Sequence, residues 1–159
     1  AKKWFWNPNI PLWVTLWYFS HYQLKIFLEG QWESDKAHGD GVLTHMNGEE
    51  YKGQWKFDKA SGYGVYTFNE GTKYTGYFVH NMFHVKGSEL WLNGTRYEGD
   101  FYLGKKHGKG KIYFIDGNVY EGDLENGNIH GHGTYDFSDK KNYTGKKFVV
   151  IILNRRVCV

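Results

Sequence analysis

The sequence predicts an all-β protein that forms an elongated single-sheet array of stacked β-hairpins. Of its 159 residues, 21 are glycine, two are proline and 19% are aromatic, which suits short strands and tight turns better than helices. Glycine and aromatic residues also recur every 23 residues, as the near-identical segments YEGDF (97–101) and YEGDL (120–124) illustrate. Such a fixed period is typical of a repeat array.

The 23-residue period aligns into columns that define one repeat unit. An unbroken glycine column runs through Gly30, Gly53, Gly76, Gly99, Gly122 and Gly145. Two residues before each glycine stand Leu28, Tyr51, Tyr74, Tyr97, Tyr120 and Tyr143, and two residues after it stand Trp32, Trp55, Phe78, Phe101, Leu124 and Lys147. Residues spaced by two share one face of a strand, so each unit presents its rings and its glycine on the same side.

Each repeat unit is expected to be one hairpin. The segment 64–78 predicts a strand, a tight turn and a second strand. The tight turns contain Asn47-Gly48, Glu70-Gly71, Asn93-Gly94 and Asp116-Gly117, whose glycines supply positive φ angles. The other connection, for example 102–107, is expected to be a polar six-residue loop. Successive hairpins would add side by side, each two-stranded unit advancing by about 10 Å.

The glycine column has a physical role in this prediction. A strand glycine leaves a hollow on the sheet that a neighbouring ring can cover. The aromatic columns are therefore expected to form a stacked stripe that serves as the core, because no second sheet or helix is predicted. Some rings of the stripe should pack and others could face a partner; the stripe comprises Tyr51, Trp55, Tyr74, Phe78, Trp91, Tyr97, Phe101 and Tyr120.

The two ends differ from the repeats and divide the chain into 1–27, 28–146 and 147–159. Residues 1–27 are aromatic and basic, and are expected to cap the first sheet edge or dock on protein, with a membrane interface as the alternative. A degenerate strand with Tyr22 in an aromatic column could pair onto the first unit. The candidate contacts at the ends are Trp4, Trp6, Trp13, Trp17, Lys146, Lys147, Arg155 and Arg156. The apolar segment FVVIIL (148–153) would be an aggregation hazard if exposed, so another polypeptide is expected to cover it.

No pattern in the sequence predicts catalysis. Equivalent positions in adjacent hairpins lie about 10 Å apart, too far for the column His38, His84, His107 and His130 to share a metal bound at about 2 Å. GKGK (108–111) lacks the full phosphate-loop pattern and its helix. The carboxylates of Glu98, Asp100, Glu121 and Asp123 are expected to form a solvated surface facing away from the rings. We therefore predict no enzyme activity, no cofactor and no metal.

Charge is segregated along the chain. All 17 acidic residues lie within 29–139, whereas the charged residues of both ends are all basic. Anionic lipid and nucleic acid would be repelled by this acidic body, so only the basic ends could reach a membrane surface, and no nucleic-acid partner is expected.

The single Cys158 cannot form an internal disulfide, which favours an intracellular, reducing compartment. No apolar run is long enough for a membrane-spanning helix, and the start at Ala1 indicates a fragment or a processed product.

The columns resemble MORN repeats (membrane occupation and recognition nexus). The resemblance rests on Tyr-x-Gly-x-Trp, six polar residues, Gly-x-Gly and an Asn/Asp-Gly turn, and covers about 28–146 as five full units and the start of a sixth. It departs from the pattern at Val85, Ser61, Lys140 and Lys147. The resemblance implies a non-catalytic scaffold or interaction subunit of a large protein assembly, axonemal (as in radial spokes), ciliary or cytoskeletal. Two alternatives remain: a phosphoinositide-binding membrane tether, and a regulatory array of a larger enzyme.

Overall fold

The protein is described from a computed structural model that covers residues 14–19 and 25–146. The chain divides into two compact units, residues 1–82 and 83–159, and each is considered by itself. All regular elements in the described ranges are β-strands, and no helix there could cross a membrane. The prediction of an all-β fold built from stacked antiparallel hairpins is therefore confirmed.

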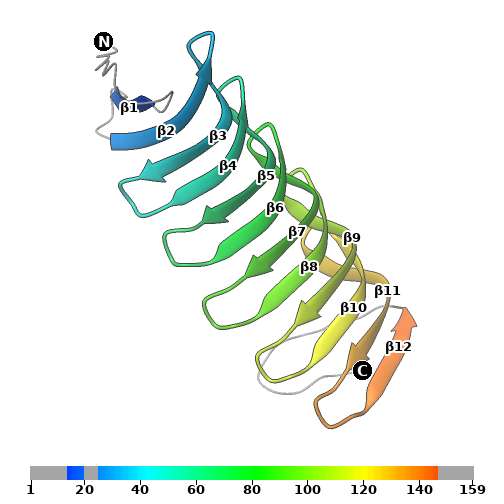
Figure 1. Cartoon of the computed structure of the whole chain (residues 1–159). Helices are drawn as coiled ribbons and strands as arrows, with labels where there is room; N and C mark the ends of the chain where they lie inside the picture. Colours follow the sequence, from blue (N-terminus) through cyan, green and yellow to red (C-terminus); the bar gives the residue numbers. More distant parts are fainter. Residues whose placement is uncertain (1–13, 20–24, 147–159) are drawn as a thin grey trace. The chain divides into compact units, whose positions relative to one another are not determined.

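In the first unit the strands lie side by side in chain order (Figure 1). They are β1 (Val14–Phe19), β2 (Lys25–Glu33), β3 (Lys36–His45), β4 (Glu50–Lys56), β5 (Lys59–Thr67) and β6 (Lys73–Val79). Every neighbouring pair is antiparallel, and β1 pairs with β2 through partners such as Leu16 and Leu28. A strand before residue 28 thus does join the first hairpin, although Tyr22 itself lies outside the described residues.

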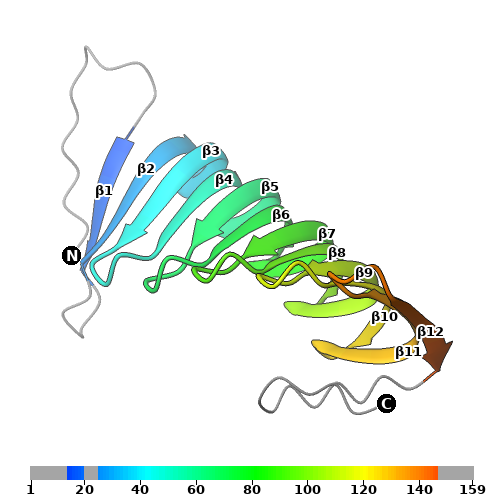
Figure 2. The same ribbon diagram turned by 90° about the horizontal axis from the view of Figure 1, so that it is seen from below.

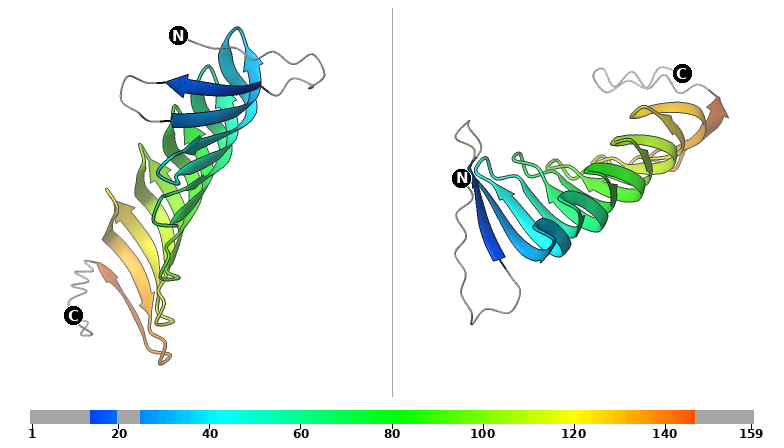
Figure 3. Two further views of the ribbon diagram at one scale, coloured as in Figure 1. Left: turned by 90° about the vertical axis from the view of Figure 1, so that its left-hand side faces the viewer. Right: turned by 90° about the horizontal axis from the view of Figure 1, so that it is seen from above.

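The second unit repeats this arrangement. Its strands are β7 (Met82–Leu90, whose first residue belongs to the first unit), β8 (Arg96–Tyr102), β9 (Lys105–Tyr113), β10 (Val119–Glu125), β11 (Asn128–Asp136) and β12 (Asn142–Lys146). All of them pair antiparallel with their neighbours in chain order. Figures 2 and 3 show that the strands within each unit are strongly curved rather than flat.

Two kinds of turn alternate along the chain, at opposite edges of each sheet (Figure 1). At one edge lie the turns that contain Asn47-Gly48 and its equivalents, and each of these turns spans three residues. In the first example the Gly48 N–H donates to the His45 carbonyl, and Gly48 has a φ of 90°. The preceding Asn47 accepts the Glu49 N–H with its side chain. The glycines therefore supply the predicted positive φ, and Lys140 takes the same conformation (φ 70°) where the last turn lacks a glycine.

The predicted six-residue loop at 102–107 is wrong. Strand β8 continues to Tyr102 and strand β9 begins at Lys105. Only Leu103 and Gly104 therefore form the turn, and both have positive φ. Such two-residue turns match the right-handed twist of the strands they join. Polar composition suggested a loop here, but paired backbone groups extend the strands through it.

A bulge follows the two-residue turn in four hairpins and accounts for the Gly-x-Gly motif. Opposite Gln31 of β2, strand β3 holds the three residues His38, Gly39 and Asp40, so the register shifts there. The first glycine of the motif adopts positive φ in four units: Gly39, Gly62, Gly108 and Gly131. In the remaining unit Val85 occupies this position with a φ of 62°. A β-branched residue in this region is strained.

We expect Val85→Gly to stabilise the protein. The exchange removes the strain of a left-handed β-branched residue, which outweighs the added chain entropy by about 1 kcal/mol. Val85 is 55% exposed, so little packing is lost. Urea unfolding should show a higher midpoint for Val85→Gly. The matched exchange Val65→Gly, in the regular part of β5, should lower it; a lower midpoint for both would refute the strain at Val85.

The core consists of the aromatic columns, which we call the ring face. Its buried members are Tyr51, Trp55, Tyr74 and Phe78 in the first unit and Tyr97, Phe101, Tyr120, Leu124 and Tyr135 in the second. Neighbouring rings meet edge to face, for example Tyr97 and Phe101 with centroids 5.2 Å apart. The column tyrosines Tyr51, Tyr74, Tyr97 and Tyr120 also donate their hydroxyls to a main-chain carbonyl three residues on, as Tyr97 does to Asp100 at 2.8 Å. The rings are thus both packed and hydrogen-bonded.

The column tyrosines lie directly over the second glycines of the Gly-x-Gly motif, which are the cross-strand partners of the glycine column. A Cβ atom added to Gly110 would overlap Cε2 of Tyr97, and one added to Gly133 would sit 2.6 Å from the same atom of Tyr120. Burial, followed by the charge of Asp123, raises the pKa of the Tyr120 phenol to about 12. The glycines therefore exist because a ring occupies the space that any side chain would need.

Candidate functional site

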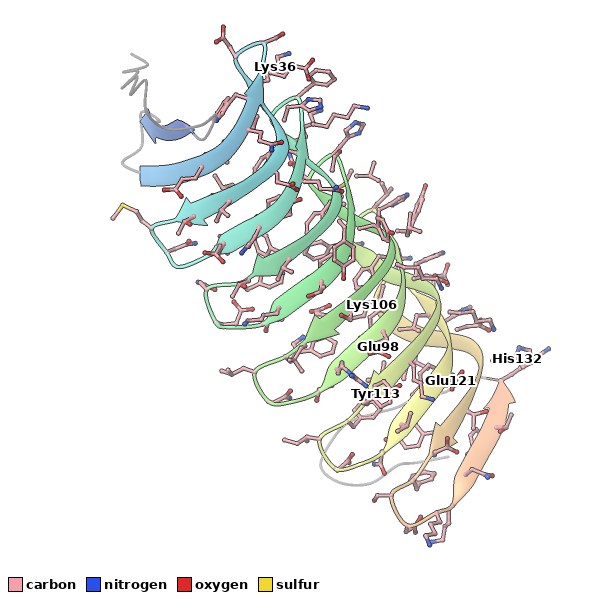
Figure 4. All side chains as sticks on the ribbon, viewed as in Figure 1. Lys36, Glu98, Lys106, Tyr113, Glu121 and His132 are labelled. Carbon is pink, nitrogen blue, oxygen red and sulfur yellow. The ribbon has the colours of Figure 1, made fainter. Side chains whose placement is uncertain are left out.

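The face opposite the rings, which we call the polar face, is covered by no other described element. In the second unit it carries two rows of side chains that cross the strands. One row is Lys86, Asp100, Lys109, Asp123 and His132; the other is Glu98, Lys111, Glu121 and Thr134. Figure 4 shows Glu98 on β8 and Glu121 on β10 among these side chains. The polar face is the surface that each sheet leaves available for binding.

Part of this polar face is structural. The carboxylates of Asp100 and Asp123 accept main-chain N–H groups of the neighbouring bulge, from Lys109 and His132, at 2.9 Å each. In the first unit the amides of Gln31 and Gln54 do the same for Asp40 and Tyr63. Asp100 and Asp123 lie on the face away from the rings, and beyond this predicted placement their side chains hold the bulge in shape.

The same carboxylates are paired with lysines. Lys86 contacts Asp100, and the Lys109 ammonium lies 2.6 Å from Asp123. The Lys109 ammonium, with the His132 N–H, holds the pKa of Asp123 below its ordinary value. At Asp100, burial works against the charge, but Lys86 and the Lys109 N–H outweigh it and lower the pKa. Glu121 pairs with Lys111 at 3.0 Å, and Glu98 with Arg96 at 3.3 Å.

These depressed pKa values predict an acid-sensitive fold. A carboxyl whose folded pKa lies below its unfolded value of about 3.9 stabilises the protein above that pH, and this contribution is lost as pH falls through the folded pKa. Melting temperature should therefore drop between about pH 4 and pH 2. Asp123→Asn keeps the acceptor but not the charge, so its drop should be smaller. The turn variant Asp116→Asn should behave like the wild type; equal drops in all three proteins would contradict the role of Asp123.

The polar face of the second unit is hollowed into a groove of about 750 Å³. Glycine backbone contributes to its lining, and charged side chains of both signs flank it. The lining side chains are Lys86, Glu98, Lys109, Lys111, Glu121, His132, Thr134, Asp136 and Thr144. Because many of these charges neutralise one another, the groove has no strong preference for one sign of ligand charge.

In the first unit the polar face is different. Tyr63 of β5 and Tyr77 of β6 are direct cross-strand partners, and their rings meet edge to face with centroids 5.6 Å apart. They are 52% and 49% exposed, and Val79 beside them is 40% exposed. The sequence analysis did not predict the pair Tyr63 and Tyr77, because neither residue belongs to an aromatic column that recurs along the chain. The available signal was that both positions are polar in the other units.

Among the described residues of the second unit, the ring face contains the charged pair Lys106 and Glu89. The ammonium of Lys106 lies 4.5 Å from the Trp91 ring centre and contacts Glu89 (Figure 4 labels Lys106). Side chains of this pair are 17% and 13% exposed. The positions equivalent to Lys106 in the first unit are Ala37 and Ala60, which are both buried. Lys106 therefore fills an aromatic pocket that would otherwise be open.

The predicted stripe must be reassigned. Seven of its members are buried, at 8% exposure or less, and Trp91 is half-buried beneath Lys106. The seven buried rings are therefore the members that pack, and a partner contact at Trp91 stays a prediction. In the glycine column, Gly53, Gly99 and Gly122 lie beside a tyrosine hydroxyl and the partner strand, whereas Gly30 meets only backbone.

Each histidine of the predicted column has its own local contacts. His84 Nδ1 accepts the Leu103 N–H at 3.4 Å, and His107 packs on the ring of Tyr102. His38 and His130 lie near the glutamates of their own hairpins, Glu33 and Glu125, at 3.3 and 3.4 Å. Among the described residues, a hydrogen bond from a turn N–H to a histidine of this column is found at His84.

The predicted contacts at the chain ends fall mostly outside the described residues. Trp4, Trp6, Trp13, Lys147, Arg155 and Arg156 lie there, as do the segment 148–153 and the side chain of Trp17. Lys146 ends β12 and is exposed. These residues stay as predictions.

Comparison with known proteins identifies the repeat. The family model of the MORN repeat matches five consecutive segments, 29–50, 51–73, 74–96, 97–119 and 120–141. Among solved structures, the chain is similar to the TCP domain of SAS-4 (dCPAP) from Drosophila melanogaster, solved in complex with a proline-rich motif of Ana2 (dSTIL). That match has a TM-score of 0.57 and 13% identity and covers 90% of this chain and 77% of the other. No curated protein matches the sequence.

Proposed function

Because the chain belongs to the MORN-repeat family, whose repeats are generally non-catalytic interaction modules, we propose that it is an interaction subunit of a larger protein assembly. It binds partner proteins on the polar face of its sheets. This proposal rests on the difference between the two faces. The rings pack together on one face, whereas no described element covers the other.

The similar SAS-4 domain supports protein partners, since that domain was solved with a peptide motif of another protein. The ends of this chain extend the proposal. Their tryptophans and the apolar segment 148–153 are suited to contact with neighbouring subunits. We further propose that the assembly is ciliary, as an axonemal or radial-spoke-like structure, or cytoskeletal, a proposal for which the family resemblance is the only support.

A second candidate rests on charge. The basic ends, including Lys146, Lys147, Arg155 and Arg156, could attract anionic phospholipid by about 1 kcal/mol per residue near the surface. The acidic segment 29–139 opposes this attraction. A membrane tether would therefore use the ends and leave the sheets free.

The two candidates separate in one experiment on the native source. Detergent extraction followed by sedimentation should leave the chain in a large particle, and lysine cross-linking should join Lys52, Lys86 or Lys109 of the polar face to other proteins. Recovery as a small species after detergent, with salt-sensitive binding to phosphoinositide vesicles, would favour the tether. Cross-links confined to Lys36, Lys59 and Lys105, the first strand residues after the two-residue turns, would move the binding surface away from the polar face.

A further inference from the structure

Tyr63 and Tyr77 form an exposed ridge on the first unit that the fold does not require. Their rings stand at 79° to one another, and about half of each remains accessible. The cross-strand pair beside them, Val65 and Thr75, is uncharged, and Lys52 lies across from Val65 on the neighbouring strand. Exposed aromatic side chains grouped in this way on a sheet are typical of binding sites.

Tyr77 also breaks a rule that the other repeat units obey. At the equivalent position Gln31, Gln54, Asp100 and Asp123 each accept a bulge N–H through a side-chain oxygen. A phenol replaces that amide or carboxylate only at Tyr77 among the five units. Departures from a locally consistent pattern are expected where function has taken precedence.

The chemistry of the ridge selects its occupant. The corresponding row of the second unit alternates lysine and aspartate, whereas here two phenols and Val79 present flat apolar surface with hydroxyl groups at the tips. Proline rings pack well on aromatic faces, and the unbonded carbonyls of a polyproline II segment accept hydroxyl hydrogens. We propose that the Tyr63–Tyr77 ridge binds a proline-rich, extended segment of a partner protein. This inference rests on the proposed function and specifies it.

A second copy of the chain is a poorer fit. Two half-exposed tyrosines offer about 200 Å², whereas a stable interface needs roughly 800 Å² on each partner. A short linear segment needs only a few rings, since its extended conformation is largely preformed.

Peptide selection on the full chain tests the ridge. A display library of random 12-residue peptides should be enriched for members with two prolines separated by two residues. Tyr77→Gln restores the amide of the other units and should keep the fold, but should weaken binding of the enriched peptides at least tenfold. Tyr102→Gln, which changes a tyrosine of similar exposure (55%) in the second unit, should leave binding unchanged.

The possible failures are distinguishable. Enriched peptides without proline, or peptides that bind Tyr77→Gln as well as the wild type, would overturn the ridge as the site while leaving protein binding intact. A dimer in sedimentation that Tyr77→Gln dissociates would also overturn it, in favour of a second copy. If no peptide is enriched and native cross-linking finds no protein partner, the proposed function falls as well.

Discussion

Gly99→Val should lower the free energy of unfolding by about 3 kcal/mol or more. A Cβ atom at Gly99 would sit 2.5 Å from the Tyr97 hydroxyl oxygen, 2.6 Å from Cα of Gly110 and 2.6 Å from the Lys109 carbonyl oxygen. Two of these three neighbours are backbone, so no side-chain rotation relieves the overlap. The paired strands β8 and β9 would have to separate, which breaks their ladder of hydrogen bonds.

His107→Ala is the matched control for this prediction. Its ring is half-buried and packs on Tyr102 with centroids 5.9 Å apart. Loss of one such contact should cost less than about 1 kcal/mol. Urea unfolding followed by circular dichroism compares the two variants, and equal midpoints would show that the glycine column is not under the constraint described.

The second large effect concerns Tyr97, which is fully buried. Tyr97→Ala removes the ring that packs on Phe101 and covers Gly110, and should cost about 3–5 kcal/mol. Tyr97→Phe keeps the ring and loses only the hydrogen bond to the Asp100 carbonyl, so about 1 kcal/mol is expected. These two variants separate the packing of the ring from its hydrogen bond.

Tyr102→Ala controls for the loss of a tyrosine as such. Its ring is 55% exposed, so its removal should change stability by less than about 1 kcal/mol. A Tyr102→Ala protein as destabilised as Tyr97→Ala would mean that the column tyrosines are not the core.

Periodicity made most of the fold predictable. The spacing of Tyr97, Gly99 and Phe101 fixes a strand and its face, and the glycine after Asn47 fixes a turn. The two-residue turn at Leu103 and Gly104 escaped prediction because its composition varies between units, while its backbone conformation does not. The bulge at Gly-x-Gly was likewise hidden, since a register shift leaves no mark on a single strand.

The candidate site was less predictable than the fold. The repetition predicts that the ring columns matter, but most of these rings are buried against one another. The proposed binding residue Tyr77 lies instead where the repeat is interrupted. The sequence alone could not say which aromatic positions are exposed, because burial depends on neighbouring strands and on the curvature of the sheet.

The central claim is that the polar face binds partners while the ring face is core. Hydroxyl-radical footprinting of the full chain, free and within its native particle, tests this directly. The claim predicts that Tyr63, Tyr77 and His132 lose reactivity in the particle, whereas Tyr74, Tyr97 and Tyr120 are unreactive in both states. Unchanged reactivity on the polar face, together with protection of turn residues such as Leu92 and Ile115, would contradict it.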